Sequence, residues 1–204
     1  LGSIQFCVVT GLTSLLYSIK TDQLITNIIG NIAGALKVGP GKGNGEWWSN
    51  STDDVSTRAC YFDDEYIFNS DGSFVNSLGD QTWLEAWQGV SADQCGTPIA
   101  PHDNSGTYSF VHDQSANVVT LLGKGAYIGL PKATNNGEID SNDKAPASRS
   151  YDVELSADGQ SATLAIEIFA GGWWTFELER KTVSPVQLMG VWGLAQEAGA
   201  VKVG

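Results

Sequence analysis

The 204-residue sequence is short of positive charge and of long apolar runs, and each shortage excludes a class of protein. It has 11 Lys and Arg against 23 Asp and Glu, which gives a net charge of −12. Binding to phosphates needs clustered cations, so a nucleic-acid-binding protein is excluded. No run of consecutive apolar residues approaches the roughly 18 that a membrane-spanning helix needs. The acidity favours a sugar, a divalent cation or a basic protein as partner, or serves solubility alone.

Cysteine and histidine are also scarce. Cys60 and Cys95 allow two interpretations, a disulfide in a protein outside the cytosol or two buried thiols, and Cys7 then has no partner. The two histidines, His102 and His112, lack the spacing of metal ligands, and the sequence has no G-x-S-x-G motif. A serine hydrolase of that type is therefore excluded.

Residues 149–181 are the clearest structural signal in the sequence. Apolar residues alternate with polar ones over 151–155, 162–168 and 174–178, as in strands with one buried face. The segments 157–160 (ADGQ) and 170–172 (AGG) supply residues suited to tight turns. The pattern predicts a three-stranded antiparallel meander whose apolar face needs a second layer or closure into a barrel.

The remaining sequence extends this pattern. Strands are predicted over 59–69, 74–78, 106–112, 117–122 and 125–130, a helical turn over 80–90, and a long rim loop over 131–148. About eight strands joined by tight turns predict an all-β protein, a single antiparallel barrel or sandwich. The glycine-rich segment 39–45 lacks the Ser or Thr of a phosphate-binding loop and is interpreted as a mobile link.

The two ends of the chain differ from this β-rich part. Leucines and isoleucines spaced by three and four over 12–36 predict an amphipathic helix, and residues 3–10 a short strand. The heptapeptides AGALKVG (33–39) and AGAVKVG (198–204) agree at six of seven positions, which indicates a tandem repeat. We expect an amino-terminal segment at 1–32, a β module at 33–182, and a linker leading into a following repeat at 183–204.

Seven tryptophans are a high number, and four of them form the adjacent pairs Trp47-Trp48 and Trp173-Trp174. Neighbours on a strand point to opposite faces, so one of each pair is expected outside the core. An exposed indole is a flat apolar platform that can stack on a sugar ring. The candidate sugar-binding residues are Trp48, Trp83, Trp87 and Trp173. The alternative is that a loop or the amino-terminal segment covers them.

Two clusters of acidic residues are candidate sites. Asp63, Asp64 and Glu65, with Asp103 from a long loop, are a candidate calcium site, because adjacent carboxylates repel unless a cation compensates them. The second cluster, Glu138, Asp140 and Asp143, is similar to the E-x-D-x-x-E strand of laminarinase-type β-glucanases, with Asp143 where Glu is expected. Such catalysis requires two carboxylates held about 5–5.5 Å apart. A polar loop holds that geometry poorly, so we expect no catalytic residues here.

Five segments together resemble a known type of module: CYFDDEYIFNSDGSF, TWLEAWQGV, CGTPIAPHD, GAYIGLPKATNNGE and GGWWTFELERK. They are similar to β modules in secreted multidomain surface proteins of marine bacteria, which often accompany immunoglobulin-like repeats and glycan-degrading domains. The resemblance covers about 33–181 and implies a lipocalin-like or jelly-roll-like fold and a Cys60–Cys95 bridge. It implies no settled activity.

Three functions remain open from the sequence. The first is a non-catalytic, extracellular glycan-binding or adhesion module of a larger secreted or cell-surface protein, with a polysaccharide or oligosaccharide as partner. The second is a glycoside hydrolase that uses the loop carboxylates. The third is a structural spacer whose outer tryptophans pack against neighbouring repeats.

Overall fold

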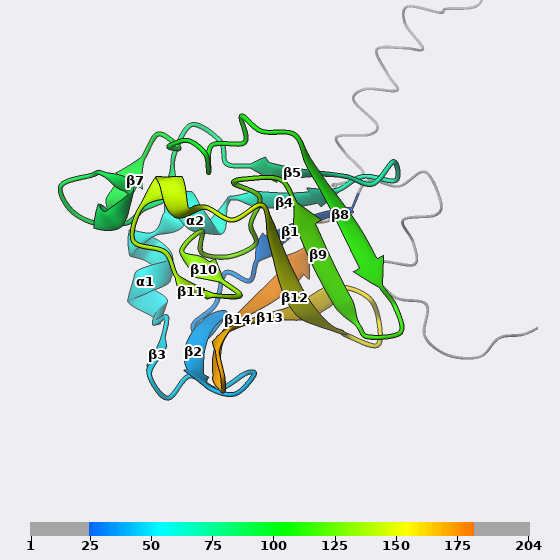
Figure 1. Ribbon diagram of the computed structural model, residues 1–204. Helices are drawn as coiled ribbons and strands as arrows, with labels where there is room; N and C mark the ends of the chain where they lie inside the picture. The colour runs from blue at the N-terminus through cyan, green and yellow to red at the C-terminus, as the bar shows by residue number, and fades with distance from the viewer. Residues whose placement is uncertain (1–24, 182–204) are drawn as a thin grey trace, which may run out of the picture.

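The computed structural model describes residues 25–181, and its main feature is a closed antiparallel barrel of eight strands (Figure 1). Hydrogen bonding between β14 and β1 closes the barrel. The all-β architecture with about eight strands is therefore confirmed. The strands follow one another around the barrel in the order β1 (Ile25–Ile29), β4 (Glu65–Phe68), β5 (Ser73–Ser77), β8 (Tyr108–Asp113), β9 (Val118–Leu122), β12 (Ser148–Leu155), β13 (Ser161–Phe169) and β14 (Gly172–Arg180).

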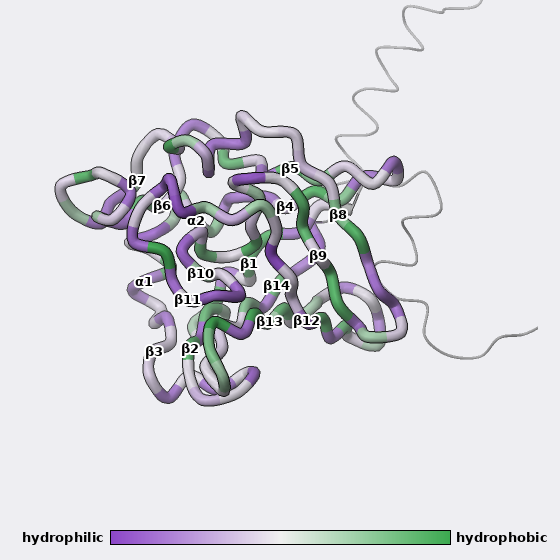
Figure 2. The backbone as a smooth tube through the Cα atoms, viewed as in Figure 1, coloured by the Kyte–Doolittle hydropathy of each residue, from purple (hydrophilic) through white to green (hydrophobic). Residues whose placement is uncertain are grey.

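The predicted meander forms the longest part of the barrel wall. Leu164 pairs with Phe176 and Ile166 with Trp174, and all four side chains are buried inside the barrel. The alternate residues of the same strands face outward, as the period of two requires. In Figure 2, hydrophobic and hydrophilic segments accordingly follow one another along the barrel strands.

One edge of β14 pairs with β13, and its other edge pairs with two different strands. Its carboxyl-terminal part pairs with β1, and its amino-terminal part pairs with β2 (Leu36–Pro40), which in turn pairs with β3 (Trp48–Ser49). The barrel wall is thereby extended by a short hairpin that lies beside the beginning of β14 (Figure 1).

The two ends of the barrel differ in their connections. Tight turns join β4 to β5, β8 to β9 and β12 to β13 at one end, whereas the long connections gather at the other end (Figure 1). No helix of residues 25–181 has the length and hydrophobicity needed to cross a membrane. The long connections contain α1 (Thr52–Thr57), α2 (Ala59–Phe62), β6 (Thr82–Leu84), the 3-10 helix η2 (Ala86–Gln88), β7 (Gln94–Gly96), β10 (Ala133–Thr134), β11 (Gly137–Glu138) and the 3-10 helix η3 (Asn142–Lys144).

The helix expected over 12–36 is wrong for the part that the structure describes. Residues 25–29 form β1 and residues 36–40 form β2, and the expected module, 33–182, omits β1 although it is a barrel strand. The sequence ITNII is rich in β-branched residues, which favour strands once partners are present. The strand expected at 3–10, Cys7 and the second heptapeptide at 198–204 lie outside the described residues.

The strand expected to start at residue 59 begins only at Glu65, because residues 59–62 form α2. α2 follows α1, whose first turn is stabilised by a capping box between Ser51 and Asp54. A disulfide joins Cys60 of α2 to Cys95 of β7, and so connects the helices to the β6–β7 hairpin. The helical turn expected over 80–90 is likewise divided into β6 and η2.

A strand was expected over 125–130, but residues 126–131 instead form a buried loop that plugs one end of the barrel. Interior side chains provide the hydrogen bonds that neighbouring strands would have supplied. The hydroxyl of Tyr66 accepts a hydrogen bond from the Gly129 amide, Tyr151 accepts one from Ile128, and Asn76 donates to the carbonyl of Tyr127. A buried peptide needs such partners, because an unpaired polar group is costly away from water.

Arg149 of β12 completes the anchoring of this plug. Its side chain is fully buried, and its guanidinium donates hydrogen bonds of 2.5–3.0 Å to the carbonyls of Ala126, Pro131 and Ala133. Burial lowers the pKa of Arg149, and neighbouring tyrosines act in the opposite direction. The planar guanidinium suits this role because its donors point in several fixed directions.

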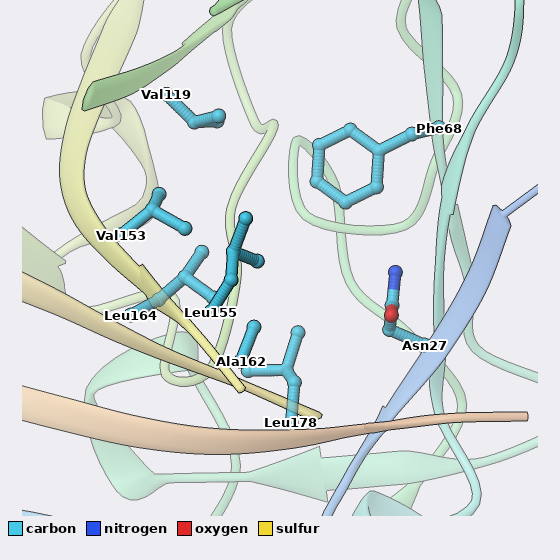
Figure 3. Close-up of a pocket in the computed structure, with 8 residues that line it drawn as sticks. All are labelled: Asn27, Phe68, Val119, Val153, Leu155, Ala162, Leu164 and Leu178. Carbon is cyan, nitrogen blue, oxygen red and sulfur yellow. The ribbon is translucent and has the colours of Figure 1, made fainter. Parts of the chain in front are cut away.

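At the opposite end of the barrel the interior holds a small apolar cavity. Phe68 and Asn27 lie on one side of it and face the aliphatic residues across a narrow space (Figure 3). The room for the centre of a water molecule is about 10 Å³, roughly that of one water. The lining consists of Asn27, Phe68, Val119, Val153, Leu155, Ala162, Leu164 and Leu178.

Candidate functional site

Within residues 25–181, the interior of the barrel has no room for a ligand the size of a sugar, since the plug fills one end and side chains fill the other. A candidate site must therefore lie on the outer surface. A groove of about 330 Å³ runs along the outer wall of β12 and β13, which is within the range of small-molecule sites. It is lined by Lys42, Ala116, Asn117, Asp152, Val153, Glu154, Thr163 and Ala165.

Strand register determines which polar side chains of β12 and β13 line this groove. Tyr151 points into the barrel, so Asp152 and Glu154 point outward. Glu154 pairs with Thr163 across the two strands. Carboxylates, a hydroxyl and the Asn117 amide thus line one shallow surface, and together they can both accept and donate hydrogen bonds.

The connection between β2 and β3 forms one side of the groove and holds Lys42 in place. The Gly43 amide donates to the Thr175 hydroxyl at 2.9 Å, and the Gly41 amide donates to the Gly171 carbonyl at 3.1 Å. Lys42 forms an ion pair with Asp152, and its ammonium lies 4.9 Å from the centre of the Trp173 ring. The segment that the sequence suggested to be a mobile link is thereby part of the site.

None of the predicted sugar-binding residues lines this groove, but Trp173 is connected to it through Lys42, which does line it. It is half-buried on the outer face of β14, while its neighbour Trp174 is buried in the core. The Lys42 ammonium lies over the Trp173 ring, and its ion pair with Asp152 links the indole to the polar side chains of the groove. An apolar ring beside hydrogen-bonding groups is the combination that a sugar requires.

For the other tryptophan pair, the structure exposes Trp47 rather than Trp48. Trp48 packs on the core, with its ring 5.9 Å from that of Trp174 and the Arg58 guanidinium 5.2 Å away. Trp47 is 50% exposed and stacks on Phe169, which is 56% exposed. Alternation requires that the neighbours face opposite ways, but only the docking of β3 against β2 decides which of them faces outward.

Trp83 and Trp87 lie away from the groove, in the β6–β7 region. Trp83 is a core residue with the Arg58 guanidinium 4.7 Å above its ring, so its assignment as a sugar platform is wrong. Trp87 is half-buried and donates from Nε1 to Glu85 at 2.9 Å. The Trp87 ring contacts the His102 ring edge-on, so we assign Trp87 a structural role.

The four acids proposed to bind calcium are dispersed. Asp63 is exposed, Glu65 pairs with Lys181, and Asp103 accepts hydrogen bonds from Ser105. Asp64 is buried and accepts a hydrogen bond of 2.6 Å from the Thr82 hydroxyl. Within residues 25–181, no three His, Cys, Asp or Glu side chains are placed to hold a metal ion. Asp64 lies in the connection between α2 and β4, where it is buried while its neighbour Asp63 is exposed.

Burial changes the titration of two interior groups. It raises the pKa of Asp64 to about 8, and the Asp63 carboxylate adds to the effect while the Thr82 hydroxyl opposes it. Burial and the Arg149 charge lower the pKa of His102 to about 4. These groups lie in the core near the long connections, away from the groove residues.

The loop carboxylates of the glycosidase hypothesis have separate structural roles. Glu138 accepts a hydrogen bond of 2.6 Å from Nε1 of Trp174, which attaches the rim loop to the core. Asp140 pairs with Lys144 at 2.6 Å, and Asp143 is exposed.

Sequence reasoning assigned no function to Lys42, Asn117, Asp152, Glu154 or Thr163. For Asp152, Glu154 and Thr163 the signal was the outward phase of the meander, which the sequence identified only as a polar face, whereas Lys42 and Asn117 lie in connections outside the meander. In comparisons with known proteins, no family model matches the chain and no curated protein is significantly similar to it.

Proposed function

We propose that this protein is a non-catalytic glycan-binding module, and that the groove on the outer wall of β12 and β13 is its binding site. The observation that carries the proposal is the placement of the Trp173 indole beside a groove lined by Asp152, Glu154 and other polar side chains. Binding sites for small polar molecules combine such an apolar surface with a few hydrogen-bonding groups that orient the ligand.

Each groove residue has a chemical role in this proposal. Sugar hydroxyls donate to the carboxylates of Asp152 and Glu154 and accept from the Asn117 amide and the Lys42 ammonium. The indole of Trp173 stacks on the C–H face of a ring at the end of the groove. An open groove on a barrel wall suits a polymer, because the chain can enter and leave at both ends.

Two further observations support an extracellular setting for this function. The Cys60–Cys95 disulfide is typical of proteins outside the cytosol. The resemblance to β modules of secreted surface proteins, which often accompany glycan-degrading domains, supports the same setting. A hydrolase is less well supported, because Glu138 and Asp140 are engaged with Trp174 and Lys144.

Affinity electrophoresis in native gels tests the proposal. The gels contain laminarin, mannan, agarose, alginate or carrageenan, and binding slows the protein relative to a polymer-free gel. We expect retardation by at least one polymer and its loss in Trp173→Ala and Glu154→Ala. The matched control is Val111→Ala, an exposed apolar side chain on the outer face of β8. Unchanged migration in all five gels would refute the proposal.

A further inference from the structure

The chain contains two Asn–Gly dipeptides, Asn44-Gly45 and Asn136-Gly137. Both lie in connections, the first between β2 and β3 and the second in the turn between β10 and β11. The backbone nitrogen of a glycine can attack the side-chain amide of a preceding asparagine, because glycine has no side chain to hinder the approach. The intrinsic chemistry of the two dipeptides is the same, so the fold decides which of them reacts.

The fold holds the first dipeptide in place. The Asn44 Oδ1 atom accepts a hydrogen bond of 2.7 Å from the Glu46 amide. A Cβ on Gly39 would lie 2.6 Å from the same atom, so the Asn44 side chain rests against the backbone of β2. Gly45 is also crowded, since a Cβ there would lie 3.2 Å from the Cβ of Ser49. Rotation of the Asn44 carboxamide toward the Gly45 nitrogen therefore costs a hydrogen bond and a packing contact.

The second dipeptide is free of such restraints. Asn136 is exposed, and its side-chain amide has no hydrogen-bond partner within residues 25–181. The turn uses the Asn136 backbone amide instead, which donates to the Thr134 hydroxyl at 3.2 Å. Gly137 has a φ of +108°, which glycine adopts readily, and a Cβ there would meet nothing within 4 Å. The Asn136 carboxamide can thus turn toward the Gly137 nitrogen without losing a contact.

We propose that Asn136 is a self-modification site, at which the folded protein converts asparagine to isoaspartate. The Gly137 nitrogen gives its proton to hydroxide and forms a bond to Cγ of Asn136, and the Cγ–Nδ2 bond breaks as ammonia leaves. The resulting five-membered succinimide takes up one water, which opens the ring at either carbonyl and leaves aspartate or isoaspartate. In sum, an amide and water become a carboxylate and ammonium, so no other reactant is needed.

The position of Asn136 between two anchors gives this reaction a structural effect. On one side, the Asn135 side chain exchanges two hydrogen bonds, of 2.9 and 2.8 Å, with the backbone of Ser150 on β12. On the other side, Glu138 accepts a hydrogen bond of 2.6 Å from Nε1 of Trp174. Isoaspartate adds a methylene group to the main chain between these anchors. The conversion therefore loosens the β10–β11 hairpin (Figure 1) from the barrel wall.

Peptide mapping of the whole chain tests the modification. The protein is kept for several days in mildly alkaline buffer, either folded or in urea, and is then digested with trypsin. Cleavage after Lys and Arg gives the peptides 43–58 and 133–144, each with one Asn–Gly dipeptide. Tandem mass spectrometry measures the replacement of –NH2 by –OH at each asparagine and distinguishes isoaspartate from aspartate.

We expect the converted fraction of the folded protein to be several-fold higher at Asn136 than at Asn44. In urea the two sites should convert at similar rates, because only the fold distinguishes them. Asn136→Gln should abolish conversion in peptide 133–144, since a longer side chain cannot form the five-membered ring. The proposal is refuted if Asn44 converts as fast as Asn136 in the folded protein.

Hydrogen exchange of residues 133–139 tests the effect on the hairpin, because exchange reports local opening. Aged wild type should exchange faster than fresh wild type, whereas Asn136→Gln should not change with age. Freshly prepared Asn136→Asp carries the new charge without the extra methylene and should exchange like fresh wild type. Equal exchange before and after conversion would refute the loosening and leave the modification site. Fast exchange in fresh Asn136→Asp would assign the effect to charge and refute the role of the longer main chain.

Discussion

Replacing Asp64 by Asn should remove most of the pH dependence of stability between pH 6 and pH 9. Asp64 is fully buried, and its Oδ2 atom accepts a hydrogen bond of 2.6 Å from Thr82. Its other oxygen, Oδ1, has no hydrogen-bond partner within residues 25–181. Asn keeps the size of the side chain and the acceptor for Thr82 but cannot ionise.

The magnitude follows from the difference in pKa between the two states. Burial raises the pKa of Asp64 from 3.8 to about 8 in the folded protein. The folded protein therefore retains a proton that the unfolded chain releases, so the contribution of Asp64 to the free energy of unfolding is largest below pH 4 and falls as the pH rises through 8. Between pH 6 and pH 9 linkage gives a fall of about 2 to 3 kcal/mol from this group.

Equilibrium unfolding in urea, followed by tryptophan fluorescence at pH 6, 7, 8 and 9, measures this fall. Asp63→Asn is the matched control, since Asp63 is the exposed neighbour of Asp64. We expect wild type and Asp63→Asn to lose stability in parallel and Asp64→Asn to remain nearly constant. The reasoning is refuted if Asp64→Asn loses as much stability as the wild type over this range.

Three further predictions concern the interior and the disulfide. His102 has a folded pKa of about 4 against 6.5 unfolded, so its contribution is present above pH 6.5 and is lost as the pH falls to 4. Relative to His102→Gln, the wild type should lose about 3 kcal/mol over that range in urea titrations. Arg149→Met leaves three buried carbonyls without a donor and should lower the free energy of unfolding by about 3 to 5 kcal/mol, with Arg180→Met, on a partly exposed residue, as control. Replacing Cys60 and Cys95 by Ser opens a loop with a sequence separation of 35 and should cost about 3 to 4 kcal/mol, whereas an unchanged urea midpoint would contradict a structural role for the bridge.

The parts of the fold that local pattern predicts are those with strict alternation and short turns. Residues 151–178 were recognised as three strands because apolar residues recur at every second position and Gly-containing turns separate them. β1 was taken for part of a helix, because its isoleucines also match a spacing of three and four. Pairing with β4 and β14 decides that ambiguity, and those partners are about 40 and 150 residues away.

The candidate site likewise has some features that local sequence pattern predicts and others that only the pairing of distant segments determines. Alternation predicted that one tryptophan of each pair lies outside, and Trp173 does so at the groove. The choice of Trp47 over Trp48, and the approach of Lys42 to Asp152, depend on the β2–β3 hairpin docking against β14. The interior roles of Arg149 and Asp64 were not predicted, since no local pattern marks a buried charge.

The sequence alone determined the all-β class, the hairpins and the two-faced character of the meander, because strand periodicity and turn chemistry act between near neighbours. Only the tertiary structure decided that the barrel closes through β1, that a loop anchored by Arg149 plugs its interior, and that Lys42 connects Trp173 to the polar groove. Those features depend on contacts between segments distant in the chain, and their geometry exists only after the barrel has closed.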